Sequence, residues 1–143
     1  MSKIFGVSFI SSYIPRQCGI ATFTNDLAVS FNKIENGSII RSNITALNDN
    51  PEGYKYSQDV KFEIKDKSIN DFKEAAYYLN LSDKDIINLQ HEFGLYGGEA
   101  GSHILYLLEN LKKPVVTTLH TVLEHPNEDQ LKVLQEINRY SSY

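Results

Sequence analysis

Cysteine is almost absent from this chain of 143 residues, in which Cys18 is the only one. A single cysteine excludes an intramolecular disulfide and any zinc site built from several cysteines, and it fits a reducing compartment. Long hydrophobic runs are absent near the start of the chain, because Gly6 and Ser8 interrupt the apolar stretch 4–10. That stretch is too short and too polar for a signal peptide or a membrane span. We therefore expect a cytoplasmic protein without a membrane-spanning segment.

The chain also lacks an excess of positive charge. It has 14 basic and 18 acidic side chains, which give a net charge of −4. No global field therefore attracts nucleic acid or an anionic membrane surface. A hydrophobic content of 41% and a charged content of 22% are those of an ordinary globular protein, and the length predicts a single domain over residues 1–143.

Strand-like and helix-like patterns alternate along the sequence. Short runs rich in β-branched and aromatic residues predict strands at 4–10, 42–47, 60–64, 85–90 and 114–120. Between them, apolar residues recur every three to four positions, as on one face of a helix. Strands separated by helices imply right-handed crossovers. The expected fold class is therefore α/β, a three-layer Rossmann-like open parallel sheet with helices on both faces.

The same periodicity predicts which helical faces are buried. In the first helix we expect an inner face made of Ile20, Phe23, Leu27, Phe31 and Ile34. Ser68 with Asp71 three residues later predicts the capped start of the second helix. Near the end of the chain, a helix is expected to begin at Asn127 and to bury Leu131, Leu134 and Ile137.

Open parallel sheets bind ligands at the carboxyl ends of their strands. The segments expected there are SSYIPRQCG (11–19), HEFGLYGG (91–98) and HTVLEHP (120–126), which together hold three of the four histidines. In the first segment, Gly19 stands where a helix begins, and a glycine there allows close approach of a ligand to unpaired backbone N–H groups. An equally weighted alternative is that Gly19 only permits a tight turn. Cys18 has no base nearby in the sequence, so it is interpreted as a small residue and not as a nucleophile.

The second segment is dense in glycine. Residues 91–101 hold His91, Glu92 and four of the eight glycines, Gly94, Gly97, Gly98 and Gly101. A zinc-protease motif would need a second histidine where Leu95 stands, so no metal site is expected. Glu99 already supplies a negative charge to the next helix, which disfavours a phosphate there and favours a ligand with hydroxyl groups, such as a sugar. A loop that merely caps the helix is an equally good explanation.

In the third segment, His120 follows an apolar strand, and its imidazole can donate and accept hydrogen bonds in a ligand site. His103 and His125 are expected to be solvated bystanders. The chain has no G-x-G-x-x-G, no P-loop, no G-x-S-x-G and no paired-carboxylate site, so dinucleotide binding, NTPase and hydrolase chemistry lack support.

Three segments, SSYIPRQCGIATFTNDLA, DIINLQHEFGLYGGEAG and PVVTTLHTV, match one pattern in order and spacing. Together they resemble the N-terminal half of the family-four retaining glycosyltransferases of the GT-B fold, over essentially the whole chain. The resemblance implies an acceptor-binding domain that faces a second, donor-binding domain across a cleft. It also implies metal-independent transfer of a sugar from a nucleotide-sugar donor with retention, without a cofactor.

The resemblance also implies roles for individual residues. His120 matches a histidine that contacts the reacting sugar, and Thr121 matches an acceptor contact. Gly19, preceded by Cys18 where many members have a second glycine, matches a backbone contact near the donor phosphates. His91 and Glu92 match acceptor contacts, and Gly97 and Gly98 lie in the same loop.

The donor-binding half of the family, which would carry a basic Arg/Lys pair and the E-x7-E motif, has no counterpart in these 143 residues. The chain alone is therefore expected to be inactive, with a C-terminal domain as partner. The surface that would face that domain could also pair two copies of the chain.

Two other functions remain open from the sequence. One is a non-catalytic Rossmann-like module that binds a glycan or a protein. The other is a response-regulator-like or flavodoxin-like domain, which would need acidic residues or a phosphate loop after the first strand. Ser11, Ser12 and Tyr13 stand there instead.

Overall fold

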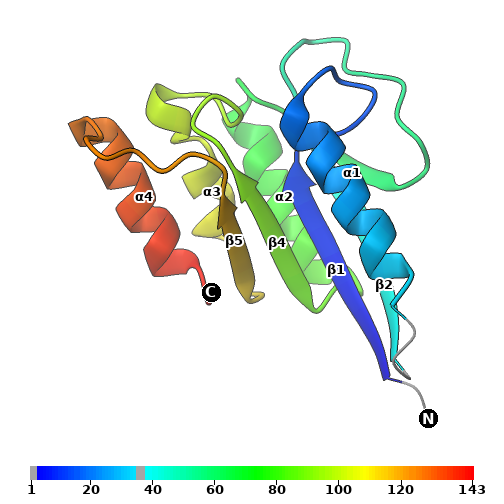
Figure 1. Ribbon diagram of the computed structural model, residues 1–143. Coiled ribbons are helices and arrows are strands. Elements are labelled where there is room, and N and C mark those ends of the chain that lie inside the picture. The colour runs from blue at the N-terminus through cyan, green and yellow to red at the C-terminus, as the bar shows by residue number, and fades with distance from the viewer. Residues whose placement is uncertain (1–2, 35–37) are drawn as a thin grey trace.

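A computed structural model describes residues 3–34 and 38–143 of the chain (Figure 1). Its elements are β1 (Lys3–Ser11), α1 (Gly19–Asn32), β2 (Ser38–Asn48), β3 (Val60–Lys65), α2 (Ile69–Leu81), β4 (Ile86–His91), the 3-10 turn η1 (Glu99–Gly101), α3 (Ile104–Leu108), β5 (Val115–Leu119) and α4 (Glu128–Tyr140). The strands form one five-stranded sheet in the order β3-β2-β1-β4-β5, and every neighbouring pair is parallel.

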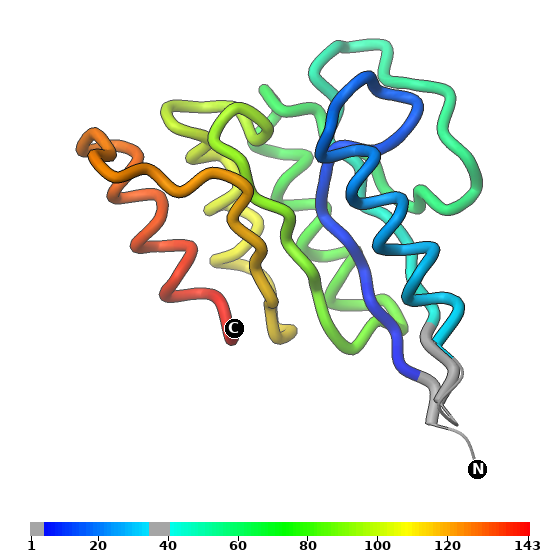
Figure 2. The backbone as a smooth tube through the Cα atoms, viewed as in Figure 1, coloured from blue at the N-terminus to red at the C-terminus, as the bar shows by residue number. Residues whose placement is uncertain are grey.

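Helices cover both faces of this sheet, which confirms the expected α/β fold class (Figure 2). Successive side chains of a strand point to opposite faces, so Phe9 and Ile10 of β1 belong to different cores. The smaller core lies under α1 and contains Val7, Phe9, Tyr13, Ala28, Ile44 and Ala46. The larger core joins Ile10 and Leu89 of the sheet to residues of α2, α3 and α4.

Side-chain caps fix the starts of two helices where the sequence predicts them. Ser68 accepts a hydrogen bond from the backbone N–H of Asp71 at the start of α2. At the start of α4, Asn127 accepts from the backbone N–H of Gln130, whose side chain accepts from the N–H of Asn127 in return. Such caps satisfy N–H groups that have no partner within the helix.

The predicted inner face of α1 is correct only in part. Ile20, Leu27 and Phe31 are partly buried and pack against the two cores, as predicted. The buried residues of this helix are Ala21, Thr24 and Ala28, whereas Phe23 is 46% exposed and Ile34, just beyond the helix, is 41% exposed. Small side chains face the sheet because bulky residues of the strands, such as Phe9, already fill the space beneath the helix.

The inner face of α4 also differs from the prediction at one position. Val133 and Ile137 are buried, and Leu131 is 46% exposed. Leu134 instead lines a groove between α4 and β5. The apolar residues of a short amphipathic helix allow it to turn about its axis, here so that Val133 rather than Leu131 lies on the buried face. Periodicity alone therefore does not fix which face is buried.

His103 is not the solvated residue that the sequence predicts. It is half-buried, and its Nδ1 lies 2.8 Å from the carbonyl oxygen of Asp66, in the turn between β3 and α2. His125, by contrast, is 91% exposed, as expected. Among residues 3–34 and 38–143, no helix combines the length and the hydrophobicity that crossing a membrane requires.

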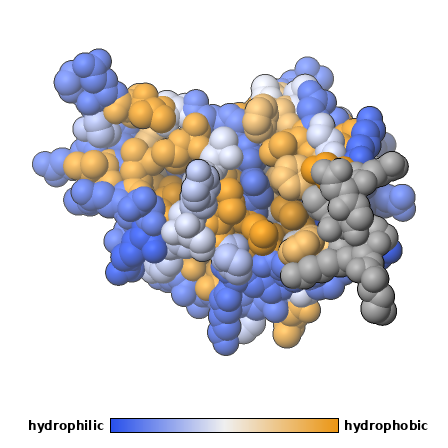
Figure 3. Space-filling model, turned by 60° about the horizontal axis from the view of Figure 1, so that its bottom comes forward, coloured by the Kyte–Doolittle hydropathy of each residue, from blue (hydrophilic) through white to orange (hydrophobic). Residues whose placement is uncertain are grey.

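The outer edge of β5 is partly covered by residues that follow α4. The N–H of Ser142 donates to the carbonyl oxygen of Val115 at 2.7 Å, and the N–H of Thr117 donates to that of Tyr143 at 2.9 Å. Figure 3, which views the molecule from below, shows hydrophobic surface bordered by polar side chains.

Candidate functional site

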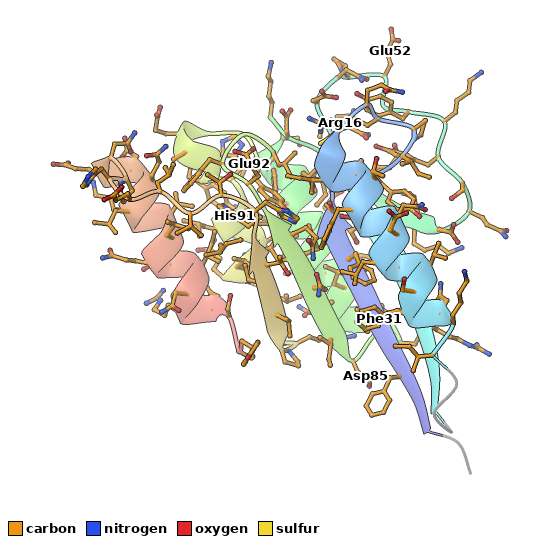
Figure 4. All side chains as sticks on the ribbon, viewed as in Figure 1. Arg16, Phe31, Glu52, Asp85, His91 and Glu92 are labelled. Carbon is orange, nitrogen blue, oxygen red and sulfur yellow. The ribbon has the colours of Figure 1, made fainter. Side chains whose placement is uncertain are left out.

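The strand order creates a switch point between β1 and β4. β1 leads to α1 on one face of the sheet, whereas β4 leads to α3 on the other face, so the two following loops diverge. Ligands of open α/β sheets bind in the crevice outside such a point. Figure 4 shows His91 and Glu92 at this end of β4, and Arg16 in the loop that leads to α1.

A neighbouring loop holds the segment between β1 and α1 in place. Arg16 makes an ion pair with Asp49 at 3.3 Å and donates to the carbonyl oxygen of Leu47 at 3.4 Å. The Tyr54 hydroxyl donates to the same Asp49 carboxylate at 2.6 Å. Because the guanidinium group is mostly buried, these contacts orient the loop 12–18 from the carboxyl end of β2.

The start of α1 has no strong cap, because among the described residues only the Cys18 thiol lies against its first N–H groups. Its N-cap, Cys18, makes no side-chain capping hydrogen bond, and the first turn contains no acidic residue. Gly19 is exposed, and a Cβ added to it would meet no atom within 4 Å. Nothing in the described chain therefore requires a glycine at this position, which leaves a smooth backbone surface beside the N–H groups of the helix.

The thiol of Cys18 lies at this helix start. Burial raises its pKa, but the Ser12 hydroxyl at 3.4 Å, the backbone N–H groups of Ala21 and Ile20, and the charge of Arg16 outweigh burial and lower the pKa overall. Sulfur is a weak acceptor, so these N–H groups can accommodate a stronger oxygen acceptor from a ligand.

His120 comes directly after β5 and points to the α1 side of the sheet. The backbone N–H of His120 donates to the backbone carbonyl oxygen of His91 at 2.9 Å. The imidazole Nε2 of His120 lies 2.7 Å from Oε1 of Gln90. Its ring meets the edge of Phe23, with centroids 5.0 Å apart. Since Phe23 lies one turn after Gly19, the structure brings His120 close to the open start of α1. Burial lowers the pKa of His120, against the opposing charge of Glu92, so the ring is neutral at pH 7.

His91 is fully buried, and among the residues that the structure describes neither of its ring nitrogens has a hydrogen-bond partner. Its ring stacks on Tyr96, with centroids 6.0 Å apart, and meets Phe93 edge-on at 5.1 Å. Burial and then the nearby His120 lower its pKa to about 4. Buried polar groups without a partner are unfavourable, so a neutral imidazole kept in this position calls for an explanation.

Glu92 and Thr121 flank these two histidines. The carboxylate of Glu92 accepts a hydrogen bond from the N–H of Gly94 at 2.8 Å, which shapes the loop after β4. The described residues make no hydrogen bond to its other oxygen, Oε1, and the charge of Glu92 acts on both His120 and Tyr96. Thr121 is half-buried in the irregular segment that follows β5.

Gly97 and Gly98 have structural explanations. Both have positive φ angles, 65° and 71°. A Cβ on Gly97 would lie 2.0 Å from the carbonyl oxygen of Asp66, and one on Gly98 would lie 2.6 Å from Ser102 and from His103. These two glycines pack against the turn before α2 and the start of α3, whereas His120 contacts Phe23 of α1 on the other face of the sheet.

Replacing Gly97 by alanine is expected to lower the free energy of unfolding by about 3 kcal/mol or more, because the side chain is strained at this φ and clashes with backbone. Chemical denaturation at pH 7 measures the change. Gly19→Ala is the matched control and should not destabilise the chain. Equal stability of Gly97→Ala and the unmodified protein would contradict this structural role.

Two residues of the site were missed from the sequence. Gln90 contacts His120. The only sign of this in the sequence was a polar side chain at the end of a strand that is otherwise buried. Phe23 was placed on the inner face of α1 by its spacing, yet it is 46% exposed and its ring makes an edge-to-face contact with that of His120.

Comparison of the chain with protein-family models, with curated proteins and with solved structures finds no match. The fold and the site therefore carry the functional argument, and the glycosyltransferase resemblance remains a hypothesis.

Proposed function

We propose that the carboxyl edge around Gly19 and His120 is the acceptor side of a retaining glycosyltransferase. The nucleotide-sugar donor would be held by a second domain facing this edge, and no metal or other cofactor would take part. The observation that carries the proposal is the contact between Phe23 and His120, which places a neutral imidazole next to the open start of α1.

Three kinds of group at this edge suit a sugar. The helix N–H groups donate to hydroxyl or phosphate oxygens. The imidazole of His120 and the free oxygen of Glu92 accept from hydroxyl groups. The exposed ring of Phe23 offers an apolar surface for the C–H face of a sugar ring. In this proposal His120 orients the reacting sugar and stabilises developing charge by hydrogen bonding, without forming a covalent bond.

Gly19→Ala is the sharpest test, because it separates binding from stability. The added methyl group meets nothing in this chain, so the free energy of unfolding should be equal or slightly higher. The methyl group would stand where a ligand approaches the backbone, so transfer should fall by roughly tenfold or more.

The assay uses the protein expressed from its complete reading frame, with a panel of nucleotide hexoses and sugar acceptors. It follows release of nucleoside diphosphate and the anomeric configuration of the product. Ser30→Ala, at an exposed position near the other end of α1, is the control and should transfer normally. Sugar binding without transfer would favour the non-catalytic module, and unchanged transfer by Gly19→Ala would remove the helix start from the site.

A further inference from the structure

Gln90 occupies the carboxyl end of β4, one residue before His91, and is fully buried. Its amide nitrogen donates to Oδ1 of Asn88 and lies 3.4 Å from Oγ1 of Thr118. Its amide oxygen lies 2.7 Å from Nε2 of His120. Both ends of one buried amide are therefore engaged, by residues of β4, of β5 and of the segment after β5.

The two ends of this amide have opposite hydrogen-bonding character. The nitrogen can only donate, and it faces two oxygen acceptors. The oxygen can only accept, so Nε2 of His120 must carry the proton in the bond between them. A neutral imidazole has one N–H, and its other nitrogen is then an acceptor.

We propose that Gln90 is a positioning residue that holds His120 as the Nε2–H tautomer and leaves Nδ1 as an open hydrogen-bond acceptor. Of the residues that the structure describes, only Gln90 hydrogen-bonds the His120 ring. Phe23 meets the ring edge-on, and the backbone of His120 is tied to that of His91. The imidazole is thus fixed in orientation as well as in protonation.

The groups that act electrostatically on His120 are few. Glu92, in the loop after β4, favours the charged ring, and burial disfavours it. Burial and the nearby His120 lower the pKa of His91 to about 4, so His91 adds no charge beside His120 at pH 7. The amide of Gln90 carries no charge, so it selects a tautomer without stabilising the imidazolium, as a carboxylate in its place would.

The tautomer of His120 is a property of the chain itself, but what the tautomer does rests on the proposed function. There, an acceptor nitrogen at this edge takes a hydrogen bond from a sugar hydroxyl group. An Nδ1–H would instead require an oxygen acceptor on the ligand. The site therefore selects a ligand that presents a hydroxyl donor to His120.

Long-range ¹H–¹⁵N NMR of the 143-residue chain tests the proposal without any ligand. At pH 7, His120 is expected to show the Nε2–H tautomer. His103 serves as an internal control of opposite type, because its Nδ1 faces the carbonyl oxygen of Asp66 and must carry the proton. An Nδ1–H tautomer at His120 would overturn the proposal, because it would require the side-chain amides of Gln90 and Asn88 to be turned so that their nitrogen and oxygen atoms exchange places.

Variants of Gln90 supply the second readout. Gln90→Leu should yield a mixture of tautomers at His120 while the signals of His103 stay in place. Gln90→Glu should raise the pKa of His120 by about one unit or more through the added charge. A purely structural role would move neither the tautomer nor the titration, so unchanged signals at His120 in both variants would overturn the proposal.

The two proposals can fail separately. If the NMR experiment gives the expected tautomer and the transfer assay gives no product, only the glycosyltransferase proposal falls. If Gln90→Leu does not fold, the unmodified chain and Gln90→Glu still decide the role of Gln90.

Discussion

Lowering the pH from about 7 to 4 is expected to reduce the free energy of unfolding by about 3 kcal/mol through His91 alone. The pKa of His91 is about 4 in the folded chain, against an ordinary value of 6.5. Between pH 6.5 and 4, His91 is protonated in the unfolded chain but neutral in the folded chain, so the free energy of unfolding falls as the pH falls through this window. It levels off below the folded pKa. Burial of His120 acts in the same direction.

Urea denaturation at pH 7, 5.5 and 4 measures this dependence, and His91→Phe is expected to remove most of it. At pH 7 the phenylalanine variant should be as stable as the unmodified chain or more so, because it replaces two unpaired buried nitrogens by carbon among aromatic neighbours. His125→Phe, at a 91% exposed position, is the matched control and should keep the pH dependence. An acid dependence that persists in His91→Phe would show that His91 is not its source.

A stabilising substitution at His91 would also bear on function. Proteins retain unfavourable polar groups where activity depends on them. If His91 serves the acceptor site, His91→Phe gains stability and loses transfer; if it serves only packing, transfer is unaffected.

If the proposed glycosyltransferase function holds, replacing His120 by alanine is expected to lower transfer by the protein expressed from its complete reading frame by roughly a hundredfold, the usual cost of removing one preorganised hydrogen-bonding group from a transition state. The fold should persist, because His120 is only half-buried and lies after the end of β5. His120→Asn keeps a short polar acceptor and should retain more activity than His120→Ala. The measurement is the rate of nucleoside diphosphate release at saturating donor and acceptor.

His125→Ala is the control for this pair, because its side chain is highly exposed five residues further along the same segment. It should transfer sugar at the normal rate. Unchanged turnover in His120→Ala would exclude His120 from the reacting centre, whereas the role of Gln90 in fixing the tautomer is decided by NMR.

The alternation of short apolar runs with helical stripes was sufficient to predict the parallel sheet and the placement of the loops. This succeeded because continuous apolar runs such as 4–10 indicate strands buried on both faces. The orientation of α1 was predicted only in part, because Ile20, Leu27 and Phe31 pack against the cores but Phe23 does not. Its sequence offers both a bulky face through Phe23 and a small face through Ala21 and Ala28, and the bulk of the strands beneath it decides between them.

At the candidate site, too, local features could be predicted from the sequence, whereas contacts between distant residues could not. The histidine after β5 and the glycine at the start of α1 are local features, and the sequence placed them at the correct edge. Whether a glycine can be replaced depends on distant residues: at Gly97 the carbonyl oxygen of Asp66 occupies the place of a Cβ, whereas at Gly19 no described residue does. Likewise, the bond between Gln90 and His120 joins residues 30 positions apart and follows from strand pairing.

The contacts of Ser142 and Tyr143 with β5 affect how the molecule can associate. An outer strand with free N–H and carbonyl groups is a template on which another chain can add a strand. Here the polar backbone groups of Val115 and Thr117 that face outward are already occupied. Fibril-like growth from this side of the sheet would first have to displace the residues after α4.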